Sequence, residues 1–300
     1  MAVVVPVLRK RSNPVPRDRV QHVADSCIRK RLQKCVRVAL ATSSLCRRQV
    51  FLECFAGEGS VAKELRKIGY AVIAFELDEG PEFDLTRPCV LDVIRGWIRG
   101  GCVLGLFFGT PCSSWSSARR GLPGAPGGPM RSDAYPMGLP NLSPADQHRV
   151  LIGNRTLIAS TQLIRLGLQF GLPMLIENPC TSRLWKAPKL LRLTADSDLV
   201  IFDQCQYGSR WRKRTKVHGW NVSNLSRLRR LCSGRKGMCS KYGLHHLILS
   251  GNDPASKLPM TRIAQTYPAV LSKVLASILG DSSSSLVFDR VSGFWNGLGQ

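Results

Sequence analysis

The sequence predicts an α/β protein with a mostly parallel β-sheet that is covered by helices on both faces. Two observations lead to this fold class: short apolar runs alternate with helical segments, and each run is apolar throughout rather than at every second residue. Continuous apolar runs are typical of strands buried on both faces, and their alternation with helices is typical of parallel sheets. A chain of 300 residues that is 44% hydrophobic suits one large domain or two small ones.

Both ends of the chain differ from this pattern. Residues 1–50 hold twelve Lys and Arg against two acids, with prolines at positions 6, 14 and 16. We expect residues 1–48 to form a basic N-terminal arm outside the core, in which residues 22–40 are helical. Residues 281–300 begin with a serine run, and we expect a C-terminal tail there.

The core is expected between residues 49 and 280. Apolar runs predict its strands, helical periodicity predicts its helices, and a proline- and glycine-rich stretch predicts a long loop. In chain order, these elements are a strand over 50–55, a helix over 61–68, a strand over 71–75, a helix over 90–99, a strand over 103–108, a loop over 117–145, a helix over 145–170, strands over 174–176 and 199–202, and two helical pieces between 260 and 279.

Polar signatures follow the predicted strands at their carboxyl ends. They occupy residues 56–60, 76–78, 109–116, 177–179 and 203–208. Ligands of open α/β sheets bind beyond the carboxyl ends of the strands. The coincidence therefore predicts one enzyme site at this edge of the sheet.

The first of these signatures is a glycine turn, in FLECFAGEGSVAKEL. Gly57 and Gly59 allow the backbone to approach a ligand closely. Glu76 follows at the end of the next strand, where a carboxylate can accept hydrogen bonds from ribose hydroxyls. The sequence has no Walker pattern and no Lys beside the turn, which argues against a phosphate-rich nucleotide. Asp84 is either a third polar group of this pocket, suited to an exocyclic amine, or a helix cap.

Four motifs occur in one order along the chain, and together they resemble a known family. They are Phe55-Ala56-Gly57-Glu58-Gly59, Pro111-Cys112-Ser113-Ser114-Trp115-Ser116, Glu177-Asn178 and Arg210-Trp211-Arg212-Lys213-Arg214. S-adenosylmethionine-dependent DNA (cytosine-5) methyltransferases have a similar series: a Phe-x-Gly-x-Gly turn, Pro-Cys, Glu-Asn-Val and Gln-x-Arg-x-Arg. The resemblance covers residues 50–280 and implies a Rossmann-like methyltransferase fold. The chain departs from the family at Ser113, Pro179 and Arg210.

The resemblance implies a role for each matching residue. Cys112 would attack C6 of cytosine as the nucleophile, and Glu177 would hydrogen-bond or protonate N3 of the ring. Arg212 and Arg214 would stabilise charge that develops on the ring carbonyl, and Asn178 would hold the turn before Cys112. S-adenosylmethionine would be bound by Phe55, Ala56, Gly57, Gly59, Glu76, Asp84 and Pro111.

The loop over 117–145 would close over a base flipped out of its helix. Arg119 and Arg120 lie on this loop, and Arg212 and Arg214 lie on a later segment. Nearby cations lower the pKa of a thiol and so favour the reactive thiolate. We expect these arginines to have that effect on Cys112.

Residues 219–255 stand where the family inserts a target-recognition domain, and this region is short. Cysteine and histidine side chains occur in it, and Cys205 precedes the arginine segment. Cys205, Cys232, Cys239 and His246 can bind zinc tetrahedrally and fix a basic loop that is too small to fold alone. The alternative is a set of free thiols and an exposed histidine.

The distribution of charge predicts a polyanionic partner. The net charge is +23, eleven Lys and Arg lie between Arg210 and Lys241, and residues 204–252 contain no acid. DNA is the expected substrate, a structured RNA is the alternative, and a non-catalytic nucleic-acid-binding module is a third hypothesis. Eleven cysteines without a framework spacing and the lack of a membrane-spanning run indicate an intracellular protein. Basic clusters such as Arg29-Lys30-Arg31 favour the nucleus.

Overall fold

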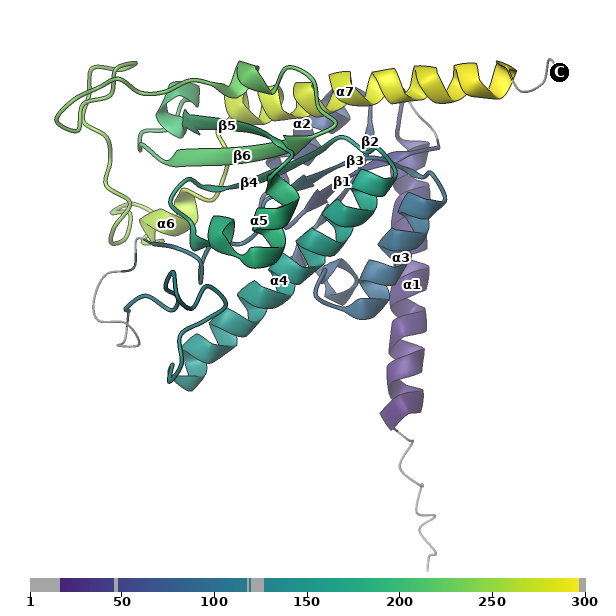
Figure 1. Ribbon diagram of the computed structural model, residues 1–300, viewed down its shortest axis with the longest axis horizontal. Coiled ribbons are helices and arrows are strands. Elements are labelled where there is room, and N and C mark those ends of the chain that lie inside the picture. Colours follow the sequence, from purple (N-terminus) through teal and green to yellow (C-terminus); the bar gives the residue numbers. More distant parts are fainter. Residues whose placement is uncertain (1–16, 46–47, 118, 120–126, 297–300) are drawn as a thin grey trace, which may run out of the picture.

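The computed structural model describes residues 17–45, 48–117, 119 and 127–296, and its centre is a six-stranded sheet (Figure 1). The strand order is β2-β1-β3-β4-β6-β5. Neighbouring strands from β2 to β4 are parallel, whereas β6 is antiparallel to both β4 and β5. The strands are β1 (Val50–Cys54), β2 (Ala71–Phe75), β3 (Val103–Phe108), β4 (Met174–Pro179), β5 (Asp198–Asp203) and β6 (Arg214–Trp220).

Helices cover one face of the sheet through a shared apolar cluster (Figure 1). Alternate strand residues such as Leu52 and Ile176 point into this cluster and are buried. Because neighbouring residues of a strand point to opposite faces, each strand contributes to two clusters, which explains its continuous apolar sequence. The helices of this face are α1 (Arg17–Ala41), α3 (Pro88–Arg99), α4 (Pro144–Gln169) and α5 (Pro188–Thr194).

The opposite face is covered by α2 (Ser60–Lys67) and α7 (Ala269–Asn296). These helices pack against the strand residues Phe51, Phe107 and Leu175. The short helix α6 (Met260–Ile263) precedes α7 in the chain. The predicted α/β class and the mostly parallel sheet with helices on both faces are therefore confirmed.

Most of the predicted elements are present. The strands predicted over 71–75 and 103–108 are β2 and β3, and the helix predicted over 145–170 is α4. The described residues between 117 and 143 contain neither helix nor strand, in agreement with the predicted loop. Strand β4 is longer than predicted and includes Glu177 and Asn178, which were expected after it. Strand β6 was not predicted as a strand.

The helix expected over residues 22–40 is present, but the prediction that this segment lies outside the core is wrong for its described part. Residues 17–41 form α1, which contacts α3 and β2. Its Ile28 and Leu32 lie four residues apart on one side of the helix and are buried in the core. The first sixteen residues of the expected arm lie outside the described residues.

The predicted boundary of a C-terminal tail at residue 281 is also wrong. Helix α7 continues through the serine run and ends at Asn296. Ser282 and Ser283 are buried, and their hydroxyl groups donate to the carbonyls of Ile278 and Gly280. Serine can remain helical when its hydroxyl bonds to a preceding carbonyl of the same helix.

The carboxyl edge of the sheet gathers the polar segments. Strand β1 has β2 on one side and β3 on the other, so the direction of the strand order changes between β1 and β3. Such a switch point opens a crevice beyond the carboxyl ends, where ligands bind in α/β sheets. The antiparallel β6 brings its amino end to the same edge, where Arg214 pairs with Asp203 at the end of β5.

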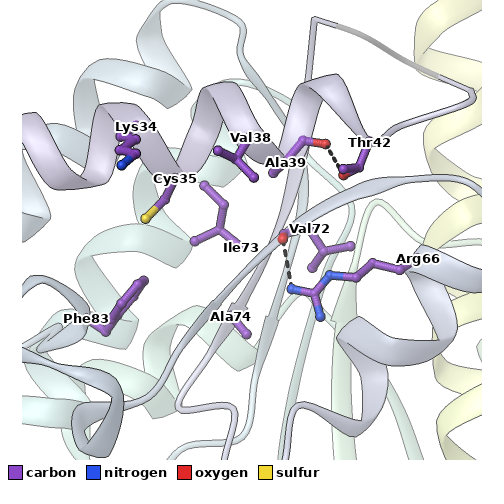
Figure 2. Close-up of a pocket in the computed structure, with 10 residues that line it drawn as sticks. All are labelled: Lys34, Cys35, Val38, Ala39, Thr42, Arg66, Val72, Ile73, Ala74 and Phe83. Atoms are coloured by element: carbon purple, nitrogen blue, oxygen red, sulfur yellow. Dashed lines mark hydrogen bonds between the residues drawn. The ribbon is translucent and has the colours of Figure 1, made fainter.

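A cavity of about 360 Å³ lies between α1 and β2 (Figure 2). Lys34, Arg66 and Phe83 are among its lining residues, which include none of the predicted site residues. Among the helices of the described chain, none combines the length and apolar character that a membrane crossing requires.

Candidate functional site

The glycine turn after β1 has an unusual backbone. Phe55, Gly57 and Gly59 have φ angles of 59°, 54° and 62°, in the left-handed region that favours glycine. A Cβ at Gly57 or Gly59 would meet no atom within 4 Å, so open space lies beside the turn. The Gly57 N–H donates to Glu76 Oε2 at 2.6 Å. The turn and the end of β2 therefore lie together, as predicted, and the strained Phe55 is typical of a functional site.

Glu53 is a buried carboxylate of this site that sequence reasoning missed. It lies in β1, and its oxygens accept the backbone N–H groups of Val61 at 3.4 Å and Ala62 at 2.6 Å. It therefore caps α2, whose N-cap residue Gly59 has no side chain to do so. Burial raises the pKa of Glu53 to about 7. A lone acid inside the apolar run VFLEC was the available signal.

The turn after β3 places Cys112 at the carboxyl edge. Asn178 Nδ2, on β4, donates to the carbonyl of Thr110 at 2.6 Å, and the hydroxyls of Thr110 and Ser160 lie 3.1 Å apart. The expectation that Asn178 holds this turn is confirmed. Because Pro111 follows the bonded carbonyl directly, the contact fixes the backbone that leads into Cys112.

Cys112 is half-buried in a mixed electrostatic environment. Burial raises the pKa of its thiol, the positive charge of Lys213 lowers it, and the negative charge of Glu177 raises it further. Lys213 also donates to the carbonyl of Ala264 at 3.2 Å. The cation that acts on Cys112 is thus Lys213, which lies between the two arginines that were expected in this role.

Glu177 is buried, with one oxygen bonded and the other not. Tyr267 Oη donates to Glu177 Oε2 at 2.6 Å. Oε1 is buried and has no hydrogen-bond partner among the described residues. Buried carboxylate oxygens are rarely left without a partner, so a ligand that donates a hydrogen bond here would satisfy it.

Arg212 and Arg214 bind Asp203 rather than the Cys112 region. Arg214 donates to both Asp203 oxygens at 2.9 and 3.0 Å, and Arg212 Nε donates to Oδ2 at 3.3 Å. Arg212 Nη2 also donates to the carbonyl of Cys232 at 2.9 Å. Burial alone would raise the pKa of Asp203, but the hydrogen bonds from Arg214 and the Cys232 N–H, with the charge of Arg212, lower it.

The chain after Cys112 is held by the buried guanidinium of Arg131. It stacks on the Trp115 ring, 3.3 Å from the ring centroid, and donates to the backbone and hydroxyl oxygens of Ser114 and to Asn154 Oδ1. Burial lowers the pKa of Arg131 to about 10. The contacts join the Cys112 turn to α4, where Gly153 leaves room for them.

Two predicted residues have surroundings that differ from those expected. Asp84 lies in the loop before α3 rather than at a strand end, and its Oδ1 accepts from Thr86 N–H and Oγ1 at 2.9 and 2.7 Å. This geometry fits a turn-closing role better than a ligand contact. Arg119 donates to the Gly128 carbonyl and lies 3.8 Å from Asp146, within its own loop and the start of α4. Arg120 lies outside the described residues.

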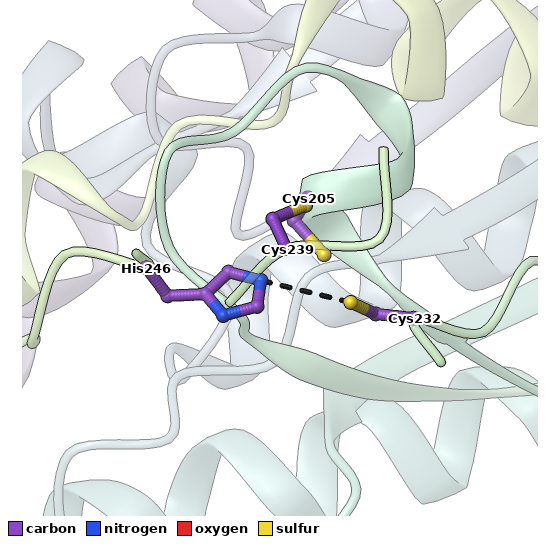
Figure 3. Close-up of side chains that lie close together, drawn as sticks. All are labelled: Cys205, Cys232, Cys239 and His246. Atoms are coloured by element: carbon purple, nitrogen blue, oxygen red, sulfur yellow. Dashed lines mark hydrogen bonds between the residues drawn. The ribbon is translucent and has the colours of Figure 1, made fainter. Parts of the chain in front are cut away.

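The four predicted metal ligands come together (Figure 3). The ligand atoms of Cys205, Cys232, Cys239 and His246 all lie within 4.8 Å of one another, and the cysteines are buried. This group can hold a metal ion. Cys205 follows β5, and the other three lie on the segment after β6, so the cluster ties this segment to the edge of the sheet.

Surrounding hydrogen bonds orient these ligands. His246 Nδ1 lies 2.8 Å from the carbonyl of Gly237, which can only accept, so Nδ1 carries the proton and Nε2 offers its lone pair. Nε2 lies 3.7 Å from Cys232 Sγ, and this sulfur accepts from the N–H and hydroxyl of Ser240 at 3.4 Å. Carbonyl partners of this kind are typical of histidines that ligate metals.

The carboxyl edge thus holds two separate groups of reactive side chains. One contains Cys112, Glu177, Tyr267 and Lys213 beside the glycine turn, and the other is the Cys/His cluster. Asp203 and its two arginines adjoin the Cys/His cluster, since Asp203 accepts from the N–H of Cys232 at 2.9 Å. No protein-family model and no curated protein matches this chain.

Proposed function

We propose that the protein transfers a methyl group from S-adenosylmethionine to C5 of cytosine in DNA, through a transient bond between Cys112 Sγ and C6 of the base. One observation carries this proposal. The half-buried Cys112 thiol lies at the carboxyl edge within the electrostatic reach of Glu177, and Oε1 of that buried carboxyl group has no partner. Addition to a cytosine ring requires a nucleophile and, beside it, a group that can hydrogen-bond to the ring nitrogen.

The side chains can divide the reaction between them. The thiolate of Cys112 forms a bond to C6, and Glu177 gives a proton to N3, which absorbs the electron pair displaced from the ring. S-adenosylmethionine, when bound, would supply a methyl group to C5, and its sulfur would keep the electron pair of the broken S–C bond as a neutral thioether. Loss of the C5 proton to solvent then breaks the bond to sulfur, returns the thiolate and lets Glu177 recover its proton. Lys213 favours the thiolate through its charge.

The glycine turn fits this cofactor better than a dinucleotide. A diphosphate needs free N–H groups at a helix N-terminus, but those of Val61 and Ala62 at the start of α2 already bond to Glu53. The carboxylate of Glu76 suits ribose hydroxyls, and Leu77 beside it is 59% exposed and offers an apolar surface to a base. Two acids near the turn also suit a positively charged sulfonium.

The sheet order supports the same proposal. The switch point between β1 and β3 lies between the glycine turn and the Cys112 turn, so cofactor and base would meet there. The reversed strand β6 carries the arginine segment to this edge. We infer from this arrangement the Rossmann-like methyltransferase fold that the motif resemblance implies.

We further infer that the Cys/His cluster binds zinc. Three sulfur ligands and one imidazole nitrogen form the donor set of structural tetrahedral zinc sites, and four protein ligands leave no position open for catalysis. The segment after β6 contains one short 3₁₀ turn, Leu225–Leu228, and two isolated β-bridges in its described residues before α6. A metal ion would supply the cross-link that this segment lacks.

DNA is the substrate we favour, and structured RNA is the alternative. The exposed Arg229, Arg235, Lys236 and Lys241 lie on the segment that carries the Cys/His cluster, and they suit a phosphate backbone. A non-catalytic nucleic-acid-binding role remains the third hypothesis. The intact pair of Cys112 and Glu177 favours the catalytic ones.

A transfer assay with labelled S-adenosylmethionine tests the proposal and separates the alternatives. Transfer to DNA cytosine is expected, together with a covalent complex on DNA that carries 5-fluorocytosine. Cys112→Ser should lose both, by about 1,000-fold or more in rate, because the covalent path is removed. The matched control is Cys102→Ser, since Cys102 is half-buried at the other end of β3.

Each other outcome of this assay decides between hypotheses. Transfer to RNA alone would establish the alternative substrate. Nucleic-acid binding without transfer to either substrate would leave the non-catalytic module. A Cys112→Ser variant as active as the wild type would exclude the covalent mechanism.

A further inference from the structure

Tyr267 joins the C-terminal part of the chain to the candidate active site. It lies between α6 and α7, ninety residues from Glu177 in the sequence, and its hydroxyl donates to Glu177 Oε2 at 2.6 Å. Its ring contacts Phe107 of β3 edge-to-face, with 5.8 Å between the ring centroids. The ring contact and the hydrogen bond fix the phenol in one orientation.

The neighbouring residues leave room for this phenol and make it a permanent donor. A Cβ on Gly109 would lie 3.2 Å from Tyr267 Oη and 3.0 Å from the carbonyl of Phe55, so glycine allows the approach. Burial and the charge of Glu177 raise the pKa of Tyr267 well above its ordinary value, and Glu53 and Cys112 act in the same direction. The hydroxyl therefore keeps its proton at any working pH.

We propose that Tyr267 is a positioning residue, which holds Glu177 Oε2 so that Oε1 is the oxygen that delivers the proton to the base. This inference rests on the proposed methyl transfer. A carboxylic acid carries one proton, and an oxygen that already accepts from a phenol is the less favourable place for it. The proton is thereby directed to Oε1, the atom without a partner among the described residues.

The loss of the hydroxyl should therefore affect turnover more than binding. In Tyr267→Phe the ring and its contact with Phe107 remain, but Glu177 is free to rotate and to place its proton on either oxygen. We expect kcat to fall by about 3- to 10-fold, which corresponds to the loss of a hydrogen bond to a neutral carboxylic acid. KM for S-adenosylmethionine should change less than about twofold, because its site lies at the glycine turn.

Tyr70→Phe is the matched control. Tyr70 also stacks edge-to-face on a phenylalanine, Phe51, and its hydroxyl donates to the carbonyl of Gly280 at 3.3 Å, away from Glu177. The two variants lose the same atom from similar surroundings. A general effect on stability should appear in both, whereas a positioning effect should appear only in Tyr267→Phe.

The experiment compares the wild type, Tyr267→Phe, Tyr70→Phe, Glu177→Gln and the double variant of Tyr267→Phe with Glu177→Gln. For each protein it measures methyl transfer, covalent trapping on 5-fluorocytosine DNA and thermal unfolding. In the Glu177→Gln background, Tyr267→Phe should cause no further loss, since the proton that it directs is gone. A Tyr267→Phe enzyme with kcat within twofold of the wild type, or an equal further loss in the double variant, would overturn the positioning role. A wild-type protein without transfer or trapping would instead overturn the proposed function.

Discussion

Glu53 and Glu177 are buried carboxyl groups on the same face of the sheet, but their hydrogen bonds differ. Both oxygens of Glu53 accept hydrogen bonds from backbone N–H groups of α2, so this side chain serves to cap the helix. Glu177 has one bonded oxygen and one without a partner among the described residues. Burying a polar atom without a partner costs about 1–3 kcal/mol, so evolution retains such an atom where it has a task. At the residue scale, this difference favours Glu177 as the carboxyl group that takes part in the proposed reaction, whereas Glu53 caps a helix.

Lys213 should control the pH dependence of the reaction. Burial raises the pKa of Cys112 above its ordinary value and the charge of Lys213 lowers it, so Lys213→Gln should raise it further. Less thiolate is then present at neutral pH, and the rising limb of the pH–rate profile should move to higher pH. Near pH 7.5 we expect a rate about three- to tenfold lower, with recovery at alkaline pH.

The control for this prediction is Lys216→Gln. Lys216 lies on β6 with its Nζ 5.4 Å from the centre of the Trp185 ring, and it is not among the groups that shift the pKa of Cys112. Its profile should overlay that of the wild type. If Lys213→Gln left the profile in place, the thiolate would depend on another cation.

Helix α4 supports the turn that carries Cys112 through a glycine. A Cβ at Gly153 would collide with Ser114 Oγ and lie 2.9 Å from Arg131 Nη2, both of which hold the chain after Cys112. Gly153→Ala should therefore lower the free energy of unfolding by about 1–3 kcal/mol and reduce methyl transfer. Chemical denaturation and the transfer assay measure the two effects.

Gly96→Ala offers a control of opposite sign. Gly96 lies inside α3, and a Cβ there would meet no atom within 4 Å. Alanine in a helix without a clash stabilises by about 0.4–1 kcal/mol, mainly by restricting the unfolded chain. If both variants changed stability in the same direction, crowding at Gly153 would not be the cause.

Elements buried on both faces were predictable from sequence, and elements with mixed surroundings were not. Strands β2 and β3 have continuous apolar sequences and were predicted with their observed bounds. Strand β6, RTKVHGW, carries two cations and a histidine, and only its partners β4 and β5 make it a strand. Helix α1 was predicted as a helix over residues 22–40, but its basic composition suggested an arm outside the core, where the structure instead buries Ile28 and Leu32.

The candidate site was predictable where residue type alone indicates chemistry. Cysteines and a histidine in a short basic segment suggested a metal cluster, and the structure brings those four residues together. The partners of the arginines were not predictable, because Asp203 meets Arg214 only through the pairing of β5 with the unrecognised β6. Tyr267 was missed for a similar reason, since only the path of the chain before α7 brings it to Glu177.

In the molecule as a whole, the Cys/His cluster connects the segment after β6 to the sheet. Cys205 lies in the 3₁₀ turn Gln204–Tyr207 that follows β5. The N–H of Cys232 donates to Asp203, and the carbonyl of Cys232 accepts from Arg212. Ions bound only by the folded state stabilise it by mass action. A zinc ion here should therefore stabilise the β5–β6 edge as well as the segment itself.

Removal of the metal should separate these parts. The purified protein is expected to contain about one zinc per chain by elemental analysis, and a strong chelator should lower Tm by at least about 5 °C. Cys239→Ser should bind no zinc and show the lowered Tm without chelator, because a hydroxyl is a poor zinc ligand. Cys180→Ser, a half-buried cysteine outside the cluster, should retain both zinc and Tm. The opposite outcome is a protein that is isolated without metal and has the same Tm with added zinc as with chelator. It would show that the four side chains pack as free thiols and an imidazole. The arginines at Asp203 would then be held by the fold alone.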